Sequence, residues 1–148
     1  MIFRVRRVRR PRPPAKSVSK RPSQASRPLT MRERLAAEQQ NDLRAKAKRV
    51  LPARTLDLVK STGINYNIQR DGIRLGAMRT RWGSRSSSGT ISLNIGLVRL
   101  PNHLIDYVII HELCHIVHMN HSPAFWAEVA KHCPHYRAYR KEIKTYRP

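Results

Sequence analysis

The feature that most constrains the fold is an apolar run that leads directly into a cluster of ionisable side chains. Residues 104–110 are mostly apolar, and the pentapeptide His111-Glu112-Leu113-Cys114-His115 follows them without a break. A helix of this composition cannot face solvent, so the rest of the chain must cover it. Imidazole and carboxylate groups on such a helix need polar partners or a metal ion.

The two histidines of the pentapeptide have the spacing of metal ligands on a helix. Residues at i and i+4 share one helical face, so His111 and His115 can bind one ion. Glu112 then lies beside that ion, where a carboxylate can take a proton from water. The sequence therefore predicts one Zn²⁺ ion with Glu112 as general base. The pentapeptide alone also occurs where its side chains form a solvated face or are hydrogen-bonded core histidines.

The candidates for the third metal ligand lie after the pentapeptide. On a continuous helix His118 lies about 10 Å from His111 along the axis, too far to share a tetrahedral ion. His121 can return to the ion if the chain turns at Met119-Asn120, because Asn tolerates the left-handed conformation that ends helices. We therefore expect His121 as the third ligand and His118 beside the site. Glu128, on the following helix, is the weaker alternative.

Further stretches, in the same order along the chain, carry a family resemblance. They are Arg81-Trp82-Gly83-Ser84, Gly89-Thr90-Ile91-Ser92-Leu93-Asn94, residues 106–115, Asn120-His121-Ser122-Pro123-Ala124-Phe125-Trp126 and Cys133-Pro134-His135-Tyr136. Over about residues 35–146 the chain resembles the YgjP-like zinc metallopeptidases, relatives of the SprT and WLM groups. The resemblance implies a zincin-like domain with His111, His115 and His121 as ligands and Glu112 as the catalytic residue.

The chain differs from that family pattern at two points. Arg85 stands where the family usually has a cysteine after Trp-Gly-Ser, and it is a candidate contact for an anionic substrate. A short basic segment replaces the longer, β-rich N-terminal section of the family, which bears on whether the substrate groove is complete.

Local signals predict helices in the N-terminal part of the domain. Thr30 and Glu33 have the form of a capping box, and a helix is expected from there to about Val50. Pro52 interrupts or restarts the helix. Gly63 ends the second helical stretch in a left-handed conformation.

Strands and further helices follow. Alternating apolar residues predict a strand over 64–69, and two more strands are expected near 74–82 and 90–94. Ser122-Pro123 begins another helix, and a last helix is expected over 134–146. The predicted fold is α+β, a minimal zincin-like core in which a small antiparallel sheet packs on the helix of the pentapeptide and its flanking helices.

Three residues are candidates for contacts with the substrate or the reacting atoms. In zinc peptidases an edge strand beside the metal commonly pairs with the substrate backbone. By the resemblance, the strand that ends at Asn94 is the candidate for this edge. Tyr107, one helical turn before the first histidine, and His118 are the candidates for stabilising an oxyanion.

The charge of the chain is high, with a formal net charge of +21 in 148 residues. A field of this sign attracts polyanions such as nucleic acid. Residues 1–29 are rich in Arg, Lys and Pro and contain no acidic residue, so they are predicted to form a disordered basic tail before a domain over 30–148. Residues 1–28 are the candidate nucleic-acid segment. Their start also resembles a transit peptide, although the prolines oppose its usual amphipathic helix.

The cysteines and the apolar runs indicate the cellular environment of the protein. Cys114 and Cys133 are too few for a disulfide framework and indicate a reducing, cytoplasmic environment unless the tail directs the chain elsewhere. Cys114 is expected to pack as a small buried residue. No apolar run approaches the ~20 residues that cross a membrane.

These observations favour a zinc-dependent hydrolase, most simply a metallopeptidase that acts on peptides or unfolded proteins. An alternative on the same metal site is a pyrophosphatase acting on UTP, an activity assigned to some proteins similar to this family. The absence of a phosphate-binding glycine loop or a carboxylate cluster for magnesium disfavours it. A further alternative is a nucleic-acid-tethered protease of the SprT type, or a binding module whose zinc is structural.

Overall fold

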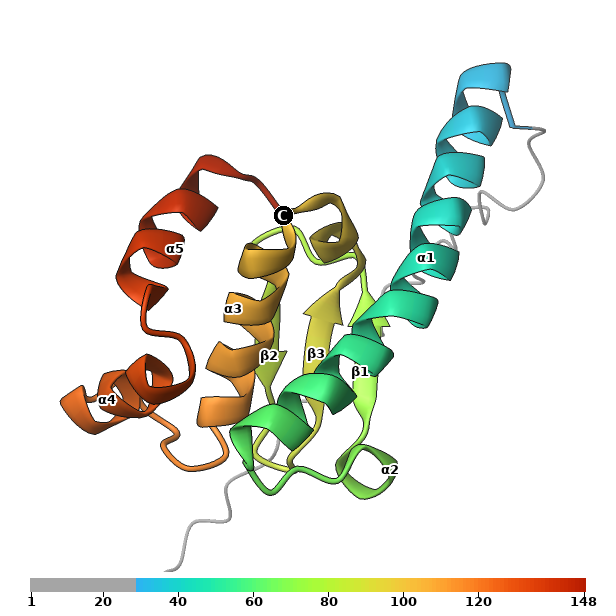
Figure 1. Ribbon diagram of the computed structural model, residues 1–148. Helices are drawn as coiled ribbons and strands as arrows, with labels where there is room; N and C mark the ends of the chain where they lie inside the picture. Colours follow the sequence, from blue (N-terminus) through green and yellow to red (C-terminus); the bar gives the residue numbers. More distant parts are fainter. Residues whose placement is uncertain (1–28) are drawn as a thin grey trace, which may run out of the picture.

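The computed structural model of the protein describes residues 29–148 (Figure 1). The predicted disordered tail, with its candidate nucleic-acid segment, lies outside the described residues apart from its last position. The elements are, in order, α1 (Met31–Thr62), α2 (Ile68–Asp71), β1 (Ile73–Gly76), β2 (Gly83–Arg85), β3 (Ile91–Asn94), the 3-10 helix η2 (Ile95–Arg99), α3 (Asn102–Cys114), α4 (Pro123–His132), α5 (Tyr136–Glu142) and the 3-10 helix η3 (Ile143–Thr145). The predicted α+β class is confirmed.

Helix α1 is continuous, whereas two stretches were predicted. Its ends are as expected: the Thr30 side chain accepts from the Glu33 N–H at 3.3 Å, the Glu33 carboxylate accepts from the Thr30 N–H at 2.8 Å, and Gly63 has a φ of 68°. Pro52 lies inside the helix without breaking it. Leu51 and Thr55, on either side of the proline, are fully buried, so tertiary packing holds the helix through this point.

The sheet is mixed rather than antiparallel. Its strand order is β1-β3-β2, with β3 antiparallel to β2 and parallel to β1. The chain crosses from β1 to β2 through residues 77–82, so that β3 returns between them and takes the direction of β1. The predicted strand over 64–69 is wrong. Ile64 and Tyr66 are buried side chains in irregular backbone, and their burial explains the alternation that suggested a strand.

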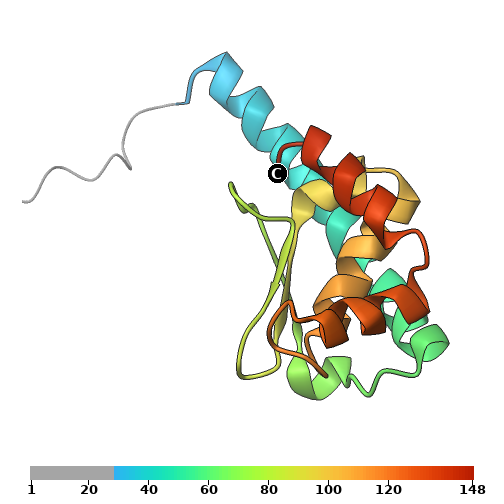
Figure 2. The same ribbon diagram turned by 90° about the vertical axis from the view of Figure 1, so that its left-hand side faces the viewer.

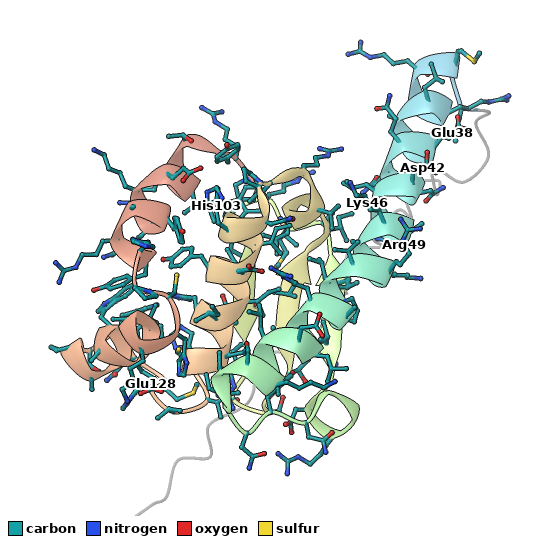
Figure 3. The ribbon with its side chains drawn as sticks, viewed as in Figure 1. Glu38, Asp42, Lys46, Arg49, His103 and Glu128 are labelled. Atoms are coloured by element: carbon teal, nitrogen blue, oxygen red, sulfur yellow. The ribbon has the colours of Figure 1, made fainter. Side chains whose placement is uncertain are left out.

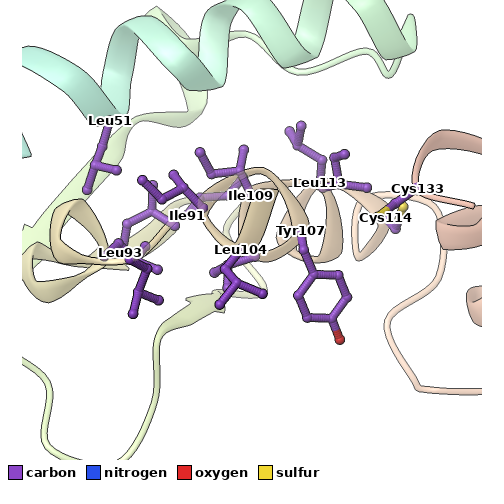
Figure 4. Packing of buried hydrophobic residues seen from close by; sticks show 14 of the residues in the cluster. Leu51, Ile91, Leu93, Leu104, Tyr107, Ile109, Leu113, Cys114 and Cys133 are labelled. Carbon is purple, nitrogen blue, oxygen red and sulfur yellow. The ribbon is translucent and has the colours of Figure 1, made fainter. Parts of the chain in front are cut away.

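Helix α3 lies at the centre of the domain. The sheet and α1 cover one side of it, and α4 and α5 lie on the other (Figures 1 and 2). Leu104, Ile109 and Leu113 of α3 are fully buried, and Leu51 and Ile91 reach the same core from α1 and β3 (Figure 4). The apolar run that precedes the pentapeptide is therefore the core of the fold.

The cysteines extend this core toward α4. Cys114 is fully buried and Cys133 is 6% exposed, and both are free thiols (Figure 4). Burial raises the pKa of Cys114 to about 12, so the thiol stays protonated. The prediction that Cys114 packs as a small buried residue is confirmed.

The helices within residues 29–148 do not meet the requirements of a membrane span. None of them is both long and apolar enough to cross a bilayer.

The burial of Leu51 gives a test of how strongly α1 is bound to the core. Leu51→Ala removes a fully buried side chain and should lower the free energy of unfolding by about 2–5 kcal/mol. Leu35→Ala, at a position of the same helix that is 49% exposed, should change it by less than about 0.5 kcal/mol. Urea unfolding followed by circular dichroism measures both, and equal effects would contradict the described packing of α1.

Candidate metal centre

The last turn of α3 and the segment after it shape the site. The helix ends at Cys114, and the chain tightens there, with the Ile116 N–H donating to Leu113 at 2.9 Å and the Val117 N–H to Cys114 at 3.1 Å. The predicted left-handed turn at Asn120 is wrong, because no residue of 29–148 other than glycine has a positive φ. The helix ends before the expected turn, and the chain folds back from that earlier point.

This turn brings the three predicted histidines together. One candidate ligand nitrogen from each of His111, His115 and His121 lies within 4.8 Å of the other two. The Nε2 atoms of His111 and His121 are 3.0 Å apart. His111 lies in the last turn of α3 and His115 is the C-cap residue of that helix, whereas His121 comes from the loop that precedes α4.

The geometry of these nitrogens fits a zinc ion. Zinc at about 2.0–2.1 Å from each of two tetrahedral ligands holds the two nitrogens about 3.4 Å apart, which is within the observed range. The Nδ1 atom of His115 is 3.0 Å from the His118 carbonyl oxygen, a contact that requires Nδ1 to carry the proton and leaves the lone pair on Nε2. His118 therefore contributes to the site through its backbone.

Burial also favours the neutral imidazoles that bind metal. It lowers the pKa of His111 to about 3, and the positive charges of His115, His121 and Arg140 act in the same direction. Burial likewise lowers the pKa of His115. Both side chains are therefore neutral at pH 7.

Packing rather than hydrogen bonding orients His111. Its Nδ1 is buried and has no hydrogen-bond partner among the described residues. The ring lies edge-on to Phe125, with centroids 4.9 Å apart, and 5.7 Å from the ring of Trp126. Phe125 also stacks on His115 at 4.5 Å. The first turn of α4, which begins with the side-chain cap of Ser122, thus supports the ligand rings from behind.

Glu112 faces the same space as the ligands and is 5% exposed. Burial raises the pKa of its carboxyl group to about 8, and the charge of Arg81 opposes this shift. No residue of 29–148 donates a hydrogen bond to the carboxylate. At this pKa the group is largely protonated at pH 7, and once ionised its poorly solvated carboxylate is a strong proton acceptor, as a general base requires.

Strand β2 passes directly over Glu112 at Gly83. A Cβ atom built on Gly83 would lie 2.7 Å from the Oε1 atom of Glu112 and 2.9 Å from its Cγ. Only glycine allows this approach of the backbone to the carboxylate. The requirement was not deduced from the sequence, although the Trp-Gly-Ser stretch that carries the resemblance contains this glycine.

The candidate ligands, Glu112 and Gly83 line one cavity of about 260 Å³. Its lining residues come from β2, the end of α3 and the loop before α4: Gly83, Ser84, Arg85, His111, Glu112, His115, Met119 and His121. Arg85 donates from Nη1 to the His115 carbonyl at 3.1 Å and contacts the Met119 sulfur at 2.9 Å. The arginine therefore connects the strand to the end of the helix and places a cation in the cavity wall.

Two other candidates lie outside this cavity. Tyr107 packs behind His111, with ring centroids 6.1 Å apart, and burial raises its pKa to about 12. Glu128, on α4 (Figure 3), is ion-paired with Lys131 at 2.6 Å and contacts His132 at 3.1 Å. The structure therefore does not place the Glu128 carboxylate among the candidate ligands.

The assignment of an edge strand to Asn94 is wrong. It lies on β3, the central strand of the sheet, and is 3% exposed. Its side-chain amide donates to the Met78 and Arg81 carbonyls, at 2.6 and 3.1 Å, and holds the 77–82 crossover. The edge beside the metal centre is β2, because it pairs only with β3.

Comparison with known proteins gives the family of the chain. The model of the YgjP-like metallopeptidase domain matches residues 3–146. The chain belongs to this family. It is therefore a member of a family of metal-dependent peptidases.

A solved structure shows a similar fold. The crystal structure of the metallopeptidase zymogen of Pyrococcus abyssi abylysin superposes with a TM-score of 0.55 at 23% sequence identity. The similarity covers 65% of this chain and 93% of abylysin. No curated protein matches the chain.

The close approach at Gly83 predicts a specific coupling with Glu112. Gly83→Ala should destabilise the fold by about 1–3 kcal/mol, because the new methyl group overlaps the buried carboxylate. Gly76→Ala is the matched control, since a Cβ there meets nothing within 4 Å. In a Glu112→Ala background the cost of Gly83→Ala should largely disappear.

Urea unfolding of the single and double variants at one fixed zinc concentration measures this coupling. A cost of Gly83→Ala that stays the same after Glu112 is shortened would show that the glycine is needed for another reason.

Proposed function

We propose that the protein is a zinc-dependent peptidase in which Glu112 is the general base. The proposal rests on one observation. His111, His115, His121 and Glu112 line the same cavity, beneath an edge strand. Family membership supports the reaction class, since the matched model is a metallopeptidase domain.

The chain's own residues account for each requirement of peptide hydrolysis. A zinc ion bound by His111, His115 and His121 would lower the pKa of a water molecule and polarise the substrate carbonyl. Glu112 takes the proton of the attacking water at a carboxylate oxygen and gives it to the leaving amine. Burial of Glu112 at 5% exposure keeps its carboxylate poorly solvated and therefore basic.

Strand β2 supplies a way to orient the substrate. Its edge opposite β3 has no strand partner within the described residues, so its backbone N–H and C=O groups can pair with an extended peptide. Gly83 and Ser84 of this strand line the cavity, so a peptide paired with the strand would lie over Glu112. An unfolded segment fits this mode of binding better than a folded surface, because the segment must become a strand.

Substitution of the general base tests the proposal. Glu112→Gln keeps the size of the side chain but removes its basicity, so cleavage of unfolded casein should fall at least about 100-fold. One zinc ion per chain should still be bound, because the three histidines are unchanged. Fluorescent casein fragments measure cleavage, and atomic absorption measures zinc.

Glu128→Gln is the matched control, since Glu128 lies on the neighbouring helix, outside the cavity. It should retain wild-type cleavage. Cleavage by Glu112→Gln at the wild-type rate would refute the proposed role of Glu112, and cleavage that resists removal of zinc by a chelator would refute a metallopeptidase.

A further inference from the structure

A second cavity, of about 790 Å³, lies between α4 and the start of α5. We call it the α4–α5 pocket. Small side chains and two aromatic rings form much of its lining, together with two arginines: Trp126, Ala127, Ala130, Tyr136, Arg137 and Arg140. No acidic residue lines it.

The pocket shares a wall with the metal centre. The indole ring of Trp126 stacks on His121, with centroids 5.6 Å apart at an interplanar angle of 24°, and it lies 5.7 Å from the ring of His111. Tyr136 stacks on Trp126 as well, at 5.4 Å and 15°. An extended peptide advances about 3.3 Å per residue, so a group one to three residues from the scissile bond can reach the pocket.

The two arginines are positioned at the aromatic wall. The Arg140 guanidinium carbon lies 4.5 Å from the centroid of the Trp126 ring, and that of Arg137 lies 5.8 Å from the centroid of Tyr136. A cation–π contact holds a guanidinium against a ring and does not use up its N–H donors. The Arg137 Nε–H donates to the Tyr136 hydroxyl at 3.2 Å, so its two terminal amino groups are the donors left for a ligand. Within residues 29–148, neither arginine forms an ion pair.

The chemistry of the pocket selects one class of ligand group. A planar guanidinium donates two parallel N–H bonds to a carboxylate, and no acidic side chain of the pocket competes for these donors. The aromatic rings and the alanines suit the methylene groups that carry such a carboxylate. An amide oxygen can accept from a guanidinium but carries no charge and offers no second equivalent oxygen, and an apolar group accepts no hydrogen bond at all.

We propose that the α4–α5 pocket binds a carboxylate of the peptide substrate, near the bond that is cleaved. The carboxylate comes either from the C-terminus of the peptide or from an Asp or Glu side chain. This inference rests on the proposed peptidase function, and it adds the substrate class to it.

The experiment compares peptides that differ in one carboxylate. One pair has a free or an amidated C-terminus, and the other pair has Glu or Gln next to the scissile bond. With the zinc-loaded full chain, kcat/KM should be about tenfold higher for the member that carries the carboxylate in at least one pair. The pair that shows the difference identifies the source of the carboxylate.

Variants then test whether the two arginines cause the preference. In the double variant Arg137→Gln, Arg140→Gln the ratio between paired peptides should fall to about one, with zinc content unchanged. Lys141→Gln, on the same helix but outside the pocket, should keep the wild-type ratio. No preference in the wild type, a preference kept by the double variant, or an equal loss in Lys141→Gln would each overturn the proposal.

A measurement of peptide affinity tests this inference independently of the proposed function. Peptide binding by the zinc-loaded Glu112→Gln variant does not depend on cleavage. Tryptophan fluorescence measures its affinity for each peptide. If no peptide is cleaved by the wild type, the proposed function fails, while the affinity ratio within each pair still decides whether the pocket binds a carboxylate.

Discussion

Burial of helix α3 is the constraint on which the rest of the structure depends. Its apolar residues, among them Leu104 and Ile109, are covered by α1 and the sheet on one side and by the C-terminal helices on the other. Its C-terminal end meets the cavity that His111, Glu112 and His115 line. The core thus holds this end of the helix in place, and Glu112 and His115 are buried because the helix that leads to them is buried.

Each neighbour of α3 stabilises part of that polar end. The loop after the helix supplies the His118 carbonyl to His115, and β2 supplies the Arg85 guanidinium to the last carbonyl of the turn. Helix α4 contributes Phe125 as a surface for the imidazole rings. Glu112 receives no such partner from residues 29–148, and the free carboxylate is the group that the proposed reaction uses.

The sequence predicted what is determined locally. Helix ends at Thr30, Gly63 and Ser122 follow from side-chain caps and backbone freedom, and they are confirmed. The spacing of His111 and His115 placed two imidazoles on one face. The predictions that were wrong concern features that depend on contacts between distant segments. The direction of β3 depends on a crossover that Asn94 holds, and a strand misassigned at Ile64 reflects burial in irregular backbone.

Prediction of the site from the sequence was limited in the same way. His121 was assigned correctly to the cluster, but through a left-handed conformation at Asn120 that the structure does not contain. The approach of Gly83 to the carboxylate joins residues 29 positions apart, and sequence spacing alone carries no information on it. The identity of the edge strand likewise requires the strand order, which is set by the whole sheet.

The proposed function requires that three histidines hold one zinc ion with a position left for water. X-ray absorption of the zinc-loaded chain tests it most directly. For such a site we expect only nitrogen and oxygen neighbours at about 2.0–2.1 Å, with multiple scattering from three imidazole rings. A sulfur neighbour at about 2.3 Å, or fewer than three imidazoles, would contradict it.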